Sequence, residues 1–165
     1  MATNMSPAVR EFWAAFKAAR SLGDEVDARF FEAFVFDDNE PSANALADLV
    51  VGGIKQATAG LVWSFEAAGV PLPKPGDLSV VTNWAGQPRC VIETTRADIV
   101  PFADVSAEFA AVEGEGDGSL DYWRRAHDAY FARECQRIGR TPQPDMPVSC
   151  ERFRVVYCPS TVQGA

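Results

Sequence analysis

The sequence has very few of the residues that bind transition metals. It contains one histidine, His127, and its four cysteines, Cys90, Cys135, Cys150 and Cys158, form no C-x-x-C pair. Zinc sites and redox motifs with the usual spacing are therefore excluded, and so is any site built from several histidines. A Ser-His-Asp or Cys-His catalytic arrangement would have to use His127. We expect no metal and no cofactor, and we expect the cysteines to be buried thiols.

Long hydrophobic runs are also missing. No stretch approaches the ~18 uninterrupted apolar residues of a transmembrane helix, and residues 1–5 lack the basic start and apolar core of a signal peptide. These absences predict a cytoplasmic protein that makes no membrane contact. With 165 residues, 47% of them hydrophobic, the chain is long enough for one domain with a respectable core.

Positive charge is scarce. Fifteen Lys and Arg residues face 23 Asp and Glu residues, which gives a net charge of −8. The chain as a whole therefore repels a phosphate backbone, and a nucleic-acid contact must use a local basic patch. Residues 121–165 carry seven arginines, Arg124 among them, against five acidic residues. These arginines form either a basic binding face or the solvated surface of a helix.

Hydrophobic spacing and turn residues indicate a mixture of helices and strands. Helices are predicted over residues 7–22, 41–51, 64–68, 104–111 and 120–138, and strands over 57–63, 78–82, 89–95, 99–102 and 148–157. Residues 29–36 are rich in aromatics, and their pattern fits a strand or the end of a helix. Because helices and strands do not alternate strictly, the sequence favours an α+β fold with a small, mostly antiparallel β-barrel and flanking helices.

A lysine and a threonine lie three residues apart in Gly53-x-Lys55-x-x-Thr58, at the predicted junction of a helix and a strand. Glycine lets the backbone approach a ligand closely, and a lysine at the mouth of a cleft can contact phosphate or, when desolvated, act as a base. The common alternative is structural: a helix-capping glycine pair, a surface lysine and a strand threonine.

An acidic, glycine-rich segment runs from Glu113 to Gly118. Its G-x-G-x-G pattern follows a predicted helix and carries Glu115 and Asp117, which argues against a phosphate-binding loop. The segment also lacks the glutamate that a calcium loop needs at its twelfth position. It is therefore either a solvated linker before the next helix or the segment that brings one carboxylate, Glu113 or Glu115, into a cleft.

The single histidine and a tryptophan also have two interpretations each. His127 lies on the apolar stripe of the predicted helix 120–138, close to Trp123, so we expect a packed histidine with one hydrogen bond rather than a catalytic one. Trp63 is able to stack on a nucleobase if its ring is exposed, but core packing is the first expectation.

Together these residues resemble a known family. Gly53-x-Lys55-x-x-Thr58 resembles the G-x-K-x-x-[ST] signature of ASCH domains, relatives of the PUA domains of RNA-modifying proteins. The segments that resemble the larger bacterial ASCH subgroup are 75–81, 90–95, 100–102, 108–117 and 150–153. The resemblance extends from residue 10 to residue 158 and implies a PUA-like β-barrel with flanking helices. It divides the chain into a helical extension packed on the barrel (1–38), an ASCH domain (39–160) and a disordered tail (161–165).

The resemblance also implies a cleft with Lys55 on its floor. The family is associated with RNA; some members are ribonucleases, and others are amidohydrolases that deacylate N4-acetylcytidine with a lysine, a threonine and a glutamate. These catalytic residues correspond to Lys55, Thr58 and Glu113, with Glu115 as the alternative to Glu113. Ser149 corresponds to a cleft residue of ribonuclease-type members. The residues expected to contact the substrate are Gly53, Ser149, Trp63, Glu115 and Arg124.

Three functions follow from this resemblance. The first is an RNA-binding protein that cleaves single-stranded RNA, in which Lys55 stabilises charge on the phosphate and Glu113 or a neutral Lys55 takes the 2′-hydroxyl proton. The second is an amidohydrolase in which Lys55 activates Thr58 as the nucleophile. The third is a non-catalytic RNA-binding module. The flanking helices and the acidic loop favour a hydrolase of the ribonuclease type, whereas the net charge favours a neutral nucleoside substrate.

Two further expectations concern stability and assembly. Because Lys55 is expected at the mouth of a cleft, its replacement by alanine should abolish activity and leave the fold intact. The apolar face of the first helix is expected either to cover the barrel or to form a homodimer.

Overall fold

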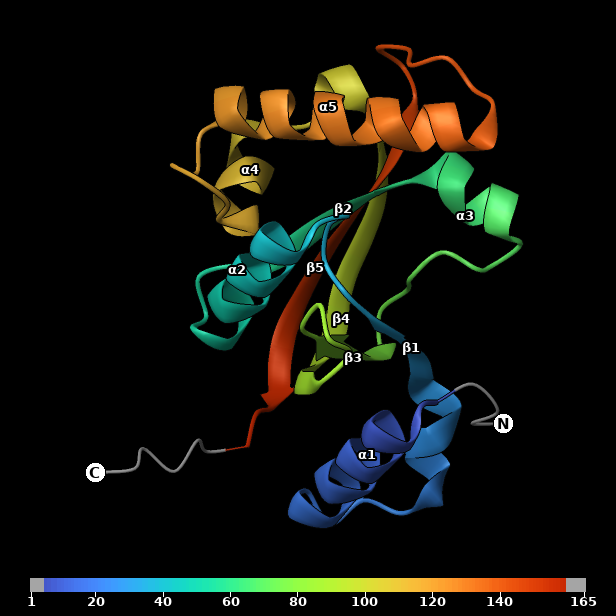
Figure 1. Ribbon diagram of the computed structural model, residues 1–165, viewed down its shortest axis with the longest axis vertical. Helices are drawn as coiled ribbons and strands as arrows, with labels where there is room; N and C mark the ends of the chain where they lie inside the picture. Colours follow the sequence, from blue (N-terminus) through green and yellow to red (C-terminus); the bar gives the residue numbers. More distant parts are fainter. Residues whose placement is uncertain (1–4, 160–165) are drawn as a thin grey trace. The chain divides into compact units, whose positions relative to one another are not determined.

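The computed structural model describes residues 5–159 and contains two compact units, each assembled from segments that are far apart in the sequence. Among the described residues, unit 1 consists of 5–52, 76–93 and 154–159, and unit 2 consists of 53–75 and 94–153. The tail predicted over 161–165 lies outside the described residues. Figure 1 labels the helices and strands of both units.

In unit 1, helix α1 (Pro7–Ala19) begins as its sequence predicts, because Ser6 Oγ accepts a hydrogen bond from the backbone N–H of Val9. Its apolar face packs into one buried cluster with strand residues. The members of this cluster are Met5, Val9, Trp13, Phe16, Val26, Leu78, Val80 and Val91. A short 3-10 helix, η1 (Asp24–Arg29), precedes strand β1 (Phe30–Phe34), so the undecided aromatic segment is a strand.

The sheet of unit 1 is built on strand β3 (Leu78–Thr82), which is buried along its whole length. Strand β1 pairs with β3 in parallel, and β4 (Pro88–Pro101) pairs with β3 in antiparallel register. Helix α2 (Glu40–Val51) begins at Asn39, whose side chain accepts a hydrogen bond from the N–H of Ser42. The antiparallel pairing of β3 with β4 confirms the hairpin that the sequence predicts.

In unit 2, strand β2 (Ala57–Leu61) runs antiparallel to β5 (Pro147–Tyr157), with Ala57 opposite Arg152 and Leu61 opposite Val148. Helix α3 (Val62–Ala68) follows β2 directly. The other elements of this unit are η2 (Phe102–Asp104), α4 (Ala107–Glu113) and α5 (Leu120–Ile138). A second buried cluster fills the space between these helices and strands, and it includes Trp123, Phe131 and Met146.

Two of the predicted strands have wrong boundaries. The strand expected over 57–63 ends at Leu61, because Val62 and Trp63 begin helix α3. Residues 99–102 were expected to form a separate short strand, but Ile99 and Val100 belong to the 14-residue strand β4. Most side chains between Thr95 and Pro101 are exposed, so the alternation of apolar and polar residues that marks a strand is lost there. Strand β4 therefore continues to Pro101, although the hydrophobic alternation ends earlier.

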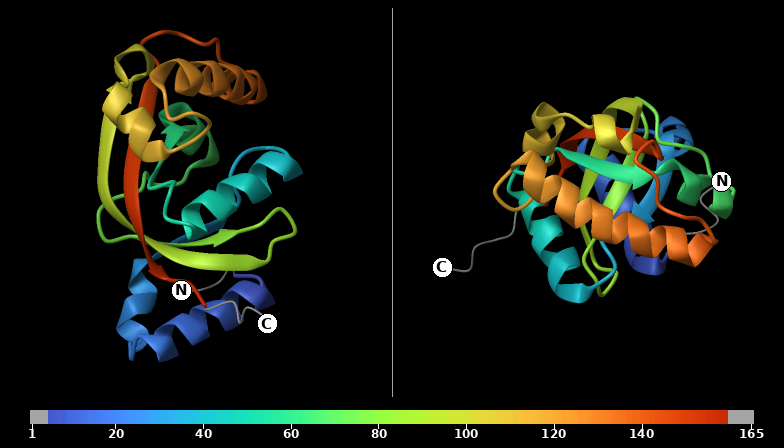
Figure 2. Two further views of the ribbon diagram at one scale, coloured as in Figure 1. Left: turned by 90° about the vertical axis from the view of Figure 1, so that its left-hand side faces the viewer. Right: turned by 90° about the horizontal axis from the view of Figure 1, so that it is seen from above.

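The five strands form one open sheet in the order β1-β3-β4-β5-β2, with β1 and β2 at its edges. The long strands β4 and β5 are neighbours, and Figure 2 shows them side by side. The mostly antiparallel sheet with flanking helices is the α+β, barrel-like architecture expected from the sequence. None of the helices within residues 5–159 has the length and apolar character needed to cross a bilayer.

Candidate functional site

The side chain of Lys55, the residue two positions before β2, is entirely buried. Its ammonium nitrogen lies 2.7 Å from the carbonyl oxygen of Ala57, 3.3 Å from Glu113 Oε1 and 2.8 Å from Glu115 Oε1. A lysine ammonium has three N–H donors, so these three acceptors fit its charged form. The expectation of a lysine at the mouth of a cleft is therefore wrong. The amine is buried because two carboxylates from far along the chain compensate its charge.

Both glutamates of the acidic loop reach this ammonium, and a glycine between them makes this possible. Gly114 ends helix α4 in the left-handed region, at φ +69°, where residues with a side chain are strained. A Cβ atom at Gly114 would lie 2.4 Å from the carbonyl oxygen of Ile54, the residue before Lys55. The close approach of these two backbone segments thus requires glycine, and it brings Glu113 and Glu115 to the same lysine.

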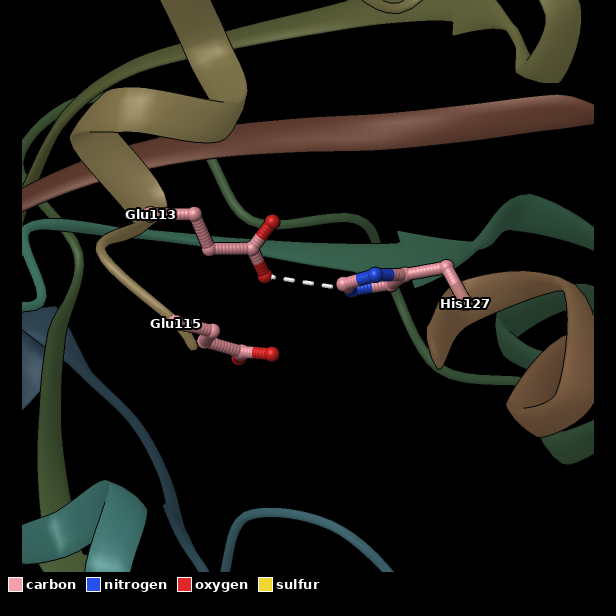
Figure 3. Close-up of side chains that lie close together, drawn as sticks. All are labelled: Glu113, Glu115 and His127. Atoms are coloured by element: carbon pink, nitrogen blue, oxygen red, sulfur yellow. Dashed lines mark ion pairs between the residues drawn. The ribbon is translucent and has the colours of Figure 1, made fainter. Parts of the chain in front are cut away.

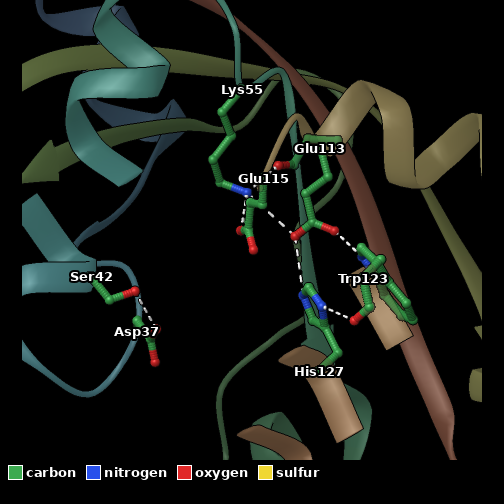
Figure 4. A network of polar contacts seen from close by, with 8 residues as sticks. Asp37, Ser42, Lys55, Glu113, Glu115, Trp123 and His127 are labelled. Carbon is green, nitrogen blue, oxygen red and sulfur yellow. Dashed lines mark hydrogen bonds and ion pairs between the residues drawn. The ribbon is translucent and has the colours of Figure 1, made fainter. Parts of the chain in front are cut away.

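Glu113 also contacts helix α5 through Trp123 and His127. The indole N–H of Trp123 donates to Glu113 Oε2, and His127 Nε2 lies 3.2 Å from Glu113 Oε1. The other ring nitrogen of His127, Nδ1, lies 2.9 Å from the carbonyl oxygen of Trp123. The two rings are stacked, with centroids 4.1 Å apart. Figure 4 shows these contacts as a continuous network from Lys55 through Glu113 to His127.

His127 and Trp123 are the site residues that the sequence did not reveal. His127 was expected to be a packed histidine with one hydrogen bond, and it is buried, but it has two polar partners. His127 lies four residues after Trp123 on the apolar stripe of α5, and this spacing predicts core packing. It does not indicate the ion pair with Glu113 of α4. The only available signal was that His127 is the single histidine of the chain.

The charges of this cluster depend on one another. Burial by itself would raise the pKa of Glu113, but the positive charges of Lys55 and His127 and the hydrogen bonds from His127 and Trp123 lower it to about 2. Burial would lower the pKa of His127, but the facing charge of Glu113 and the hydrogen bond to it outweigh burial and raise the pKa above its usual value. Glu113 is therefore ionised, and His127 favours its protonated form.

Three groups of the cluster have the spacing of metal ligands. One oxygen each of Glu113 and Glu115 and one ring nitrogen of His127 lie within 4.8 Å of one another, and Figure 3 shows the three side chains pointing toward a common point. However, the ammonium of Lys55 contacts both carboxylates. A divalent ion would have to displace this ammonium to use both glutamates, so the donor set fits the lysine better than it fits a metal.

Thr58 directly follows Ala57, whose carbonyl oxygen contacts Lys55, and it shares a face of the sheet with Ser149. Thr58 is half-buried and pairs with Glu151, and buried Ser149 pairs with Gly60, so these four residues share one face of the β2–β5 pair. Ala57, the residue between Lys55 and Thr58 that packs in the core, lies on the opposite face. The hydrogen bonds described above run from Lys55 to the glutamates rather than to Thr58.

The other residues expected to contact the substrate are Trp63, Arg124 and Gly53. The ring of Trp63 is covered by the guanidinium of Arg140, whose central carbon lies 4.5 Å from the ring centroid. Arg124 is exposed and donates to the carbonyl oxygen of Ala103, at the edge of a shallow pocket of about 270 Å³ whose lining does not include Lys55. Gly53 adopts φ +76° with open space around it.

The cysteines contribute no nucleophile to the network. Cys90, Cys135 and Cys150 are buried, as expected, whereas Cys158 is exposed. Burial raises the pKa of Cys90 and of Cys150 to about 12, so these thiols stay protonated at neutral pH.

Comparison with known proteins places this architecture in a recognised group. The family model of the ASCH domain matches residues 32–157. A crystal structure of an ASCH domain from Lactobacillus crispatus JV V101 is 38% identical, with a TM-score of 0.86, and the alignment covers 94% of this chain and 98% of that one. A protein from Enterococcus faecalis V583 is 31% identical, with a TM-score of 0.81 and coverage of 92% and 90%. No functionally curated protein matches the chain.

Proposed function

Since the chain belongs to the ASCH domain family, we propose that it binds RNA and cleaves single-stranded RNA at the cluster of Lys55, Glu113, Glu115 and His127. The observation that carries this proposal is the contact of one ammonium with two carboxylates, one of which is also paired with a histidine. Such a set supplies both a proton acceptor and positive charge, which are the two requirements of phosphodiester transfer without a metal.

Glu115 is the carboxylate that a substrate meets first. Its side chain is 15% exposed, whereas that of Glu113 is 1% exposed. In the proposed reaction, Glu115 takes the proton of a ribose 2′-hydroxyl, and the 2′-oxygen attacks phosphorus. The bond from phosphorus to the 5′-oxygen breaks, and that oxygen takes a proton from solvent. The products are a 2′,3′-cyclic phosphate and a 5′-hydroxyl end.

Lys55 stabilises the negative charge that develops on the phosphoryl oxygens in this reaction. Its ammonium already faces Glu115 at 2.8 Å, and a phosphate that approaches from the side of Glu115 would replace part of this contact. Glu113 stays behind the lysine and holds it in place from the buried side. The role of base therefore falls to Glu115, and the role of anchor falls to Glu113.

Deacylation of a neutral nucleoside such as N4-acetylcytidine is the second candidate. Two observations favour it: the net charge of −8, which repels RNA, and the small size of a nucleoside, which suits a buried cluster. It ranks second because an activated threonine nucleophile requires a neutral lysine beside it. The contacts of Lys55 with two carboxylates fit an ammonium instead.

Parallel assays with the purified protein distinguish these functions. The protein is incubated with a chelator and single-stranded RNA, and separately with N4-acetylcytidine, and the products are resolved by chromatography. We expect RNA fragments with 2′,3′-cyclic phosphate ends. Cytidine and acetate would support the second candidate, and RNA binding without turnover would reject both enzymatic functions.

A pair of variants links the activity to the cluster. Glu115→Gln removes the proposed base and should lower RNA cleavage on the order of 100-fold or more. Glu108→Gln is the matched control, because Glu108 is an exposed glutamate of α4 that pairs with Arg152 on the surface. Its activity should equal that of the wild type. Equal activity of both variants would exclude Glu115 as the base.

A further inference from the structure

We propose that His127 acts as a protonated positioning residue, an imidazolium that holds Glu113 and, through Glu113, orients the ammonium of Lys55. This inference rests on the proposed function for its catalytic consequence. Its structural part, the protonation of both ring nitrogens, stands on the contacts of His127 alone.

The partners of the two ring nitrogens determine the protonation state. Nδ1 faces the carbonyl oxygen of Trp123 at 2.9 Å, and Nε2 faces Glu113 Oε1 at 3.2 Å. A carbonyl oxygen and an ionised carboxylate are both acceptors and cannot donate. A neutral imidazole carries one N–H, so one of the two contacts would set a nitrogen lone pair against an oxygen. Only the imidazolium donates to both partners.

Glu113 cannot supply the missing proton instead. Oε2 accepts from the indole N–H of Trp123, and Oε1 already receives the ammonium of Lys55. A carboxyl group surrounded by these donors is stabilised as the anion. The proton between Glu113 and His127 therefore lies on the ring.

Charge balance leads to the same conclusion. The charged groups that face His127 are Glu113 at the end of α4, Glu115 in the loop that follows it, and Lys55 before β2. On α5 itself, the neighbours of the ring are aromatic: Trp123 is stacked on it and Phe131 meets its edge. With an imidazolium, the cluster holds two positive and two negative charges. With a neutral ring it would carry one uncompensated buried negative charge, which is costly.

The positioning role follows from the chain of contacts. Glu113 lies between His127 and Lys55 and touches both with the same oxygen, Oε1. Loss of the imidazolium removes one of the two cations that hold this oxygen. The carboxylate would then shift toward Lys55 and draw the ammonium away from Glu115, where the substrate phosphate is expected.

Nuclear magnetic resonance of the full-length protein tests the protonation state directly. The chain has one histidine, so the ¹⁵N signals of the imidazole ring belong to His127 without further assignment. We expect a titration midpoint above 6.5, the usual value of a histidine, and an N–H on both ring nitrogens below that midpoint. A midpoint at or below 6.5 would overturn the inference.

Two variants identify the source of the protonation. In Glu113→Gln the facing charge is absent, so burial should dominate and the midpoint should fall below 6.5. Asp128→Asn is the matched control, because Asp128 is an exposed acid of α5 next to His127 in sequence, and its midpoint should equal that of the wild type. A midpoint that stays high in Glu113→Gln would contradict the proposed pairing.

The catalytic consequence has a readout that a purely structural role would not change. We expect RNA cleavage by the wild type to decline as pH rises through the midpoint of His127. In His127→Gln, kcat should fall about tenfold (roughly 1.4 kcal/mol) with little change in KM, and this limb of the pH profile should disappear. An unchanged limb in His127→Gln would reject the positioning role. A doubly protonated ring in a protein that does not cleave RNA would instead reject the proposed function alone.

Discussion

The ammonium of Lys55 lies 2.8 Å from the carboxylate of Glu115, although the two residues are 60 positions apart in the sequence. Glu113, two residues before Glu115, approaches the same ammonium from the buried side. A single lysine thus contacts two carboxylates, and the left-handed Gly114 between them allows both to turn inward.

Replacement of Lys55 should destabilise the protein strongly. Lys55→Met leaves Glu115 without its cation and Glu113 with His127 alone, and the loss of one partner from a buried ion pair costs about 3–5 kcal/mol. Because Lys55 is buried, we expect Lys55→Ala to destabilise the fold as well, and not to leave it intact. Urea unfolding followed by circular dichroism measures this effect. Lys74→Met, at an exposed lysine, is the control and should lie within about 0.5 kcal/mol of the wild type.

Gly114→Ala should destabilise more than Gly118→Ala. Both glycines have positive φ, +69° and +76°, so both substitutions incur a similar backbone strain of about 1–2 kcal/mol. At Gly114 the added methyl group would also clash with the carbonyl oxygen of Ile54, whereas at Gly118 no atom outside the adjacent residues would lie within 4 Å of it. The difference in midpoint between the two variants in thermal unfolding measures the clash. Equal midpoints would show that the loop does not need a close approach at Gly114.

Acid should weaken the protein through Glu113. The pKa of Glu113 is lowered from 4.5 to about 2 in the folded state, so its contribution is complete above pH 4.5 and is lost as pH falls toward 2. A shift of this size corresponds to roughly 3 kcal/mol. The free energy of unfolding, measured at pH 6, 4 and 3, should decline in the wild type. Glu113→Gln should be less stable than the wild type at pH 6. Its free energy of unfolding should lack the part of the decline that comes from protonation of Glu113.

Trp123→Phe should reveal the hydrogen bond from the indole to Glu113. The substitution keeps an aromatic ring in the core and removes the N–H that donates to Glu113 Oε2. A hydrogen bond to a charged group contributes about 1.5–3 kcal/mol, and we expect a loss in this range in chemical unfolding. Trp84→Phe, at a tryptophan that is 44% exposed, should cost much less. Comparable losses in the two variants would argue against the indole–carboxylate bond.

Much of the fold was predictable from the sequence, because the relevant signals are local. Ser6 and Pro7 start α1, Ser119 starts α5 and Gly139 ends it, as the capping preferences of these residues predict. The hairpin of β3 and β4 follows from β-branched runs on either side of a turn. The end of β4 was missed because its exposed side chains carry no hydrophobic alternation.

The candidate site was only partly predictable. The signature residues drew attention to Lys55, and the acidic loop drew attention to Glu113 and Glu115. Residue pattern alone does not distinguish the two glutamates, and the structure shows that both contact the lysine. The stripe of apolar neighbours around His127 predicts a packed ring, and the ring is buried, but the pattern does not reveal its contact with Glu113.

The amino-acid sequence by itself determined most of the helix starts, most of the strand positions, the family resemblance and the scarcity of metal ligands, since each depends on residues close together in the chain or on composition. Only the tertiary structure decided that Lys55 is buried and that Glu113, Glu115 and His127 surround it. Spacing along the chain does not encode which charges meet across segments about 60 residues apart. Burial of an ammonium is possible only when those distant partners compensate it.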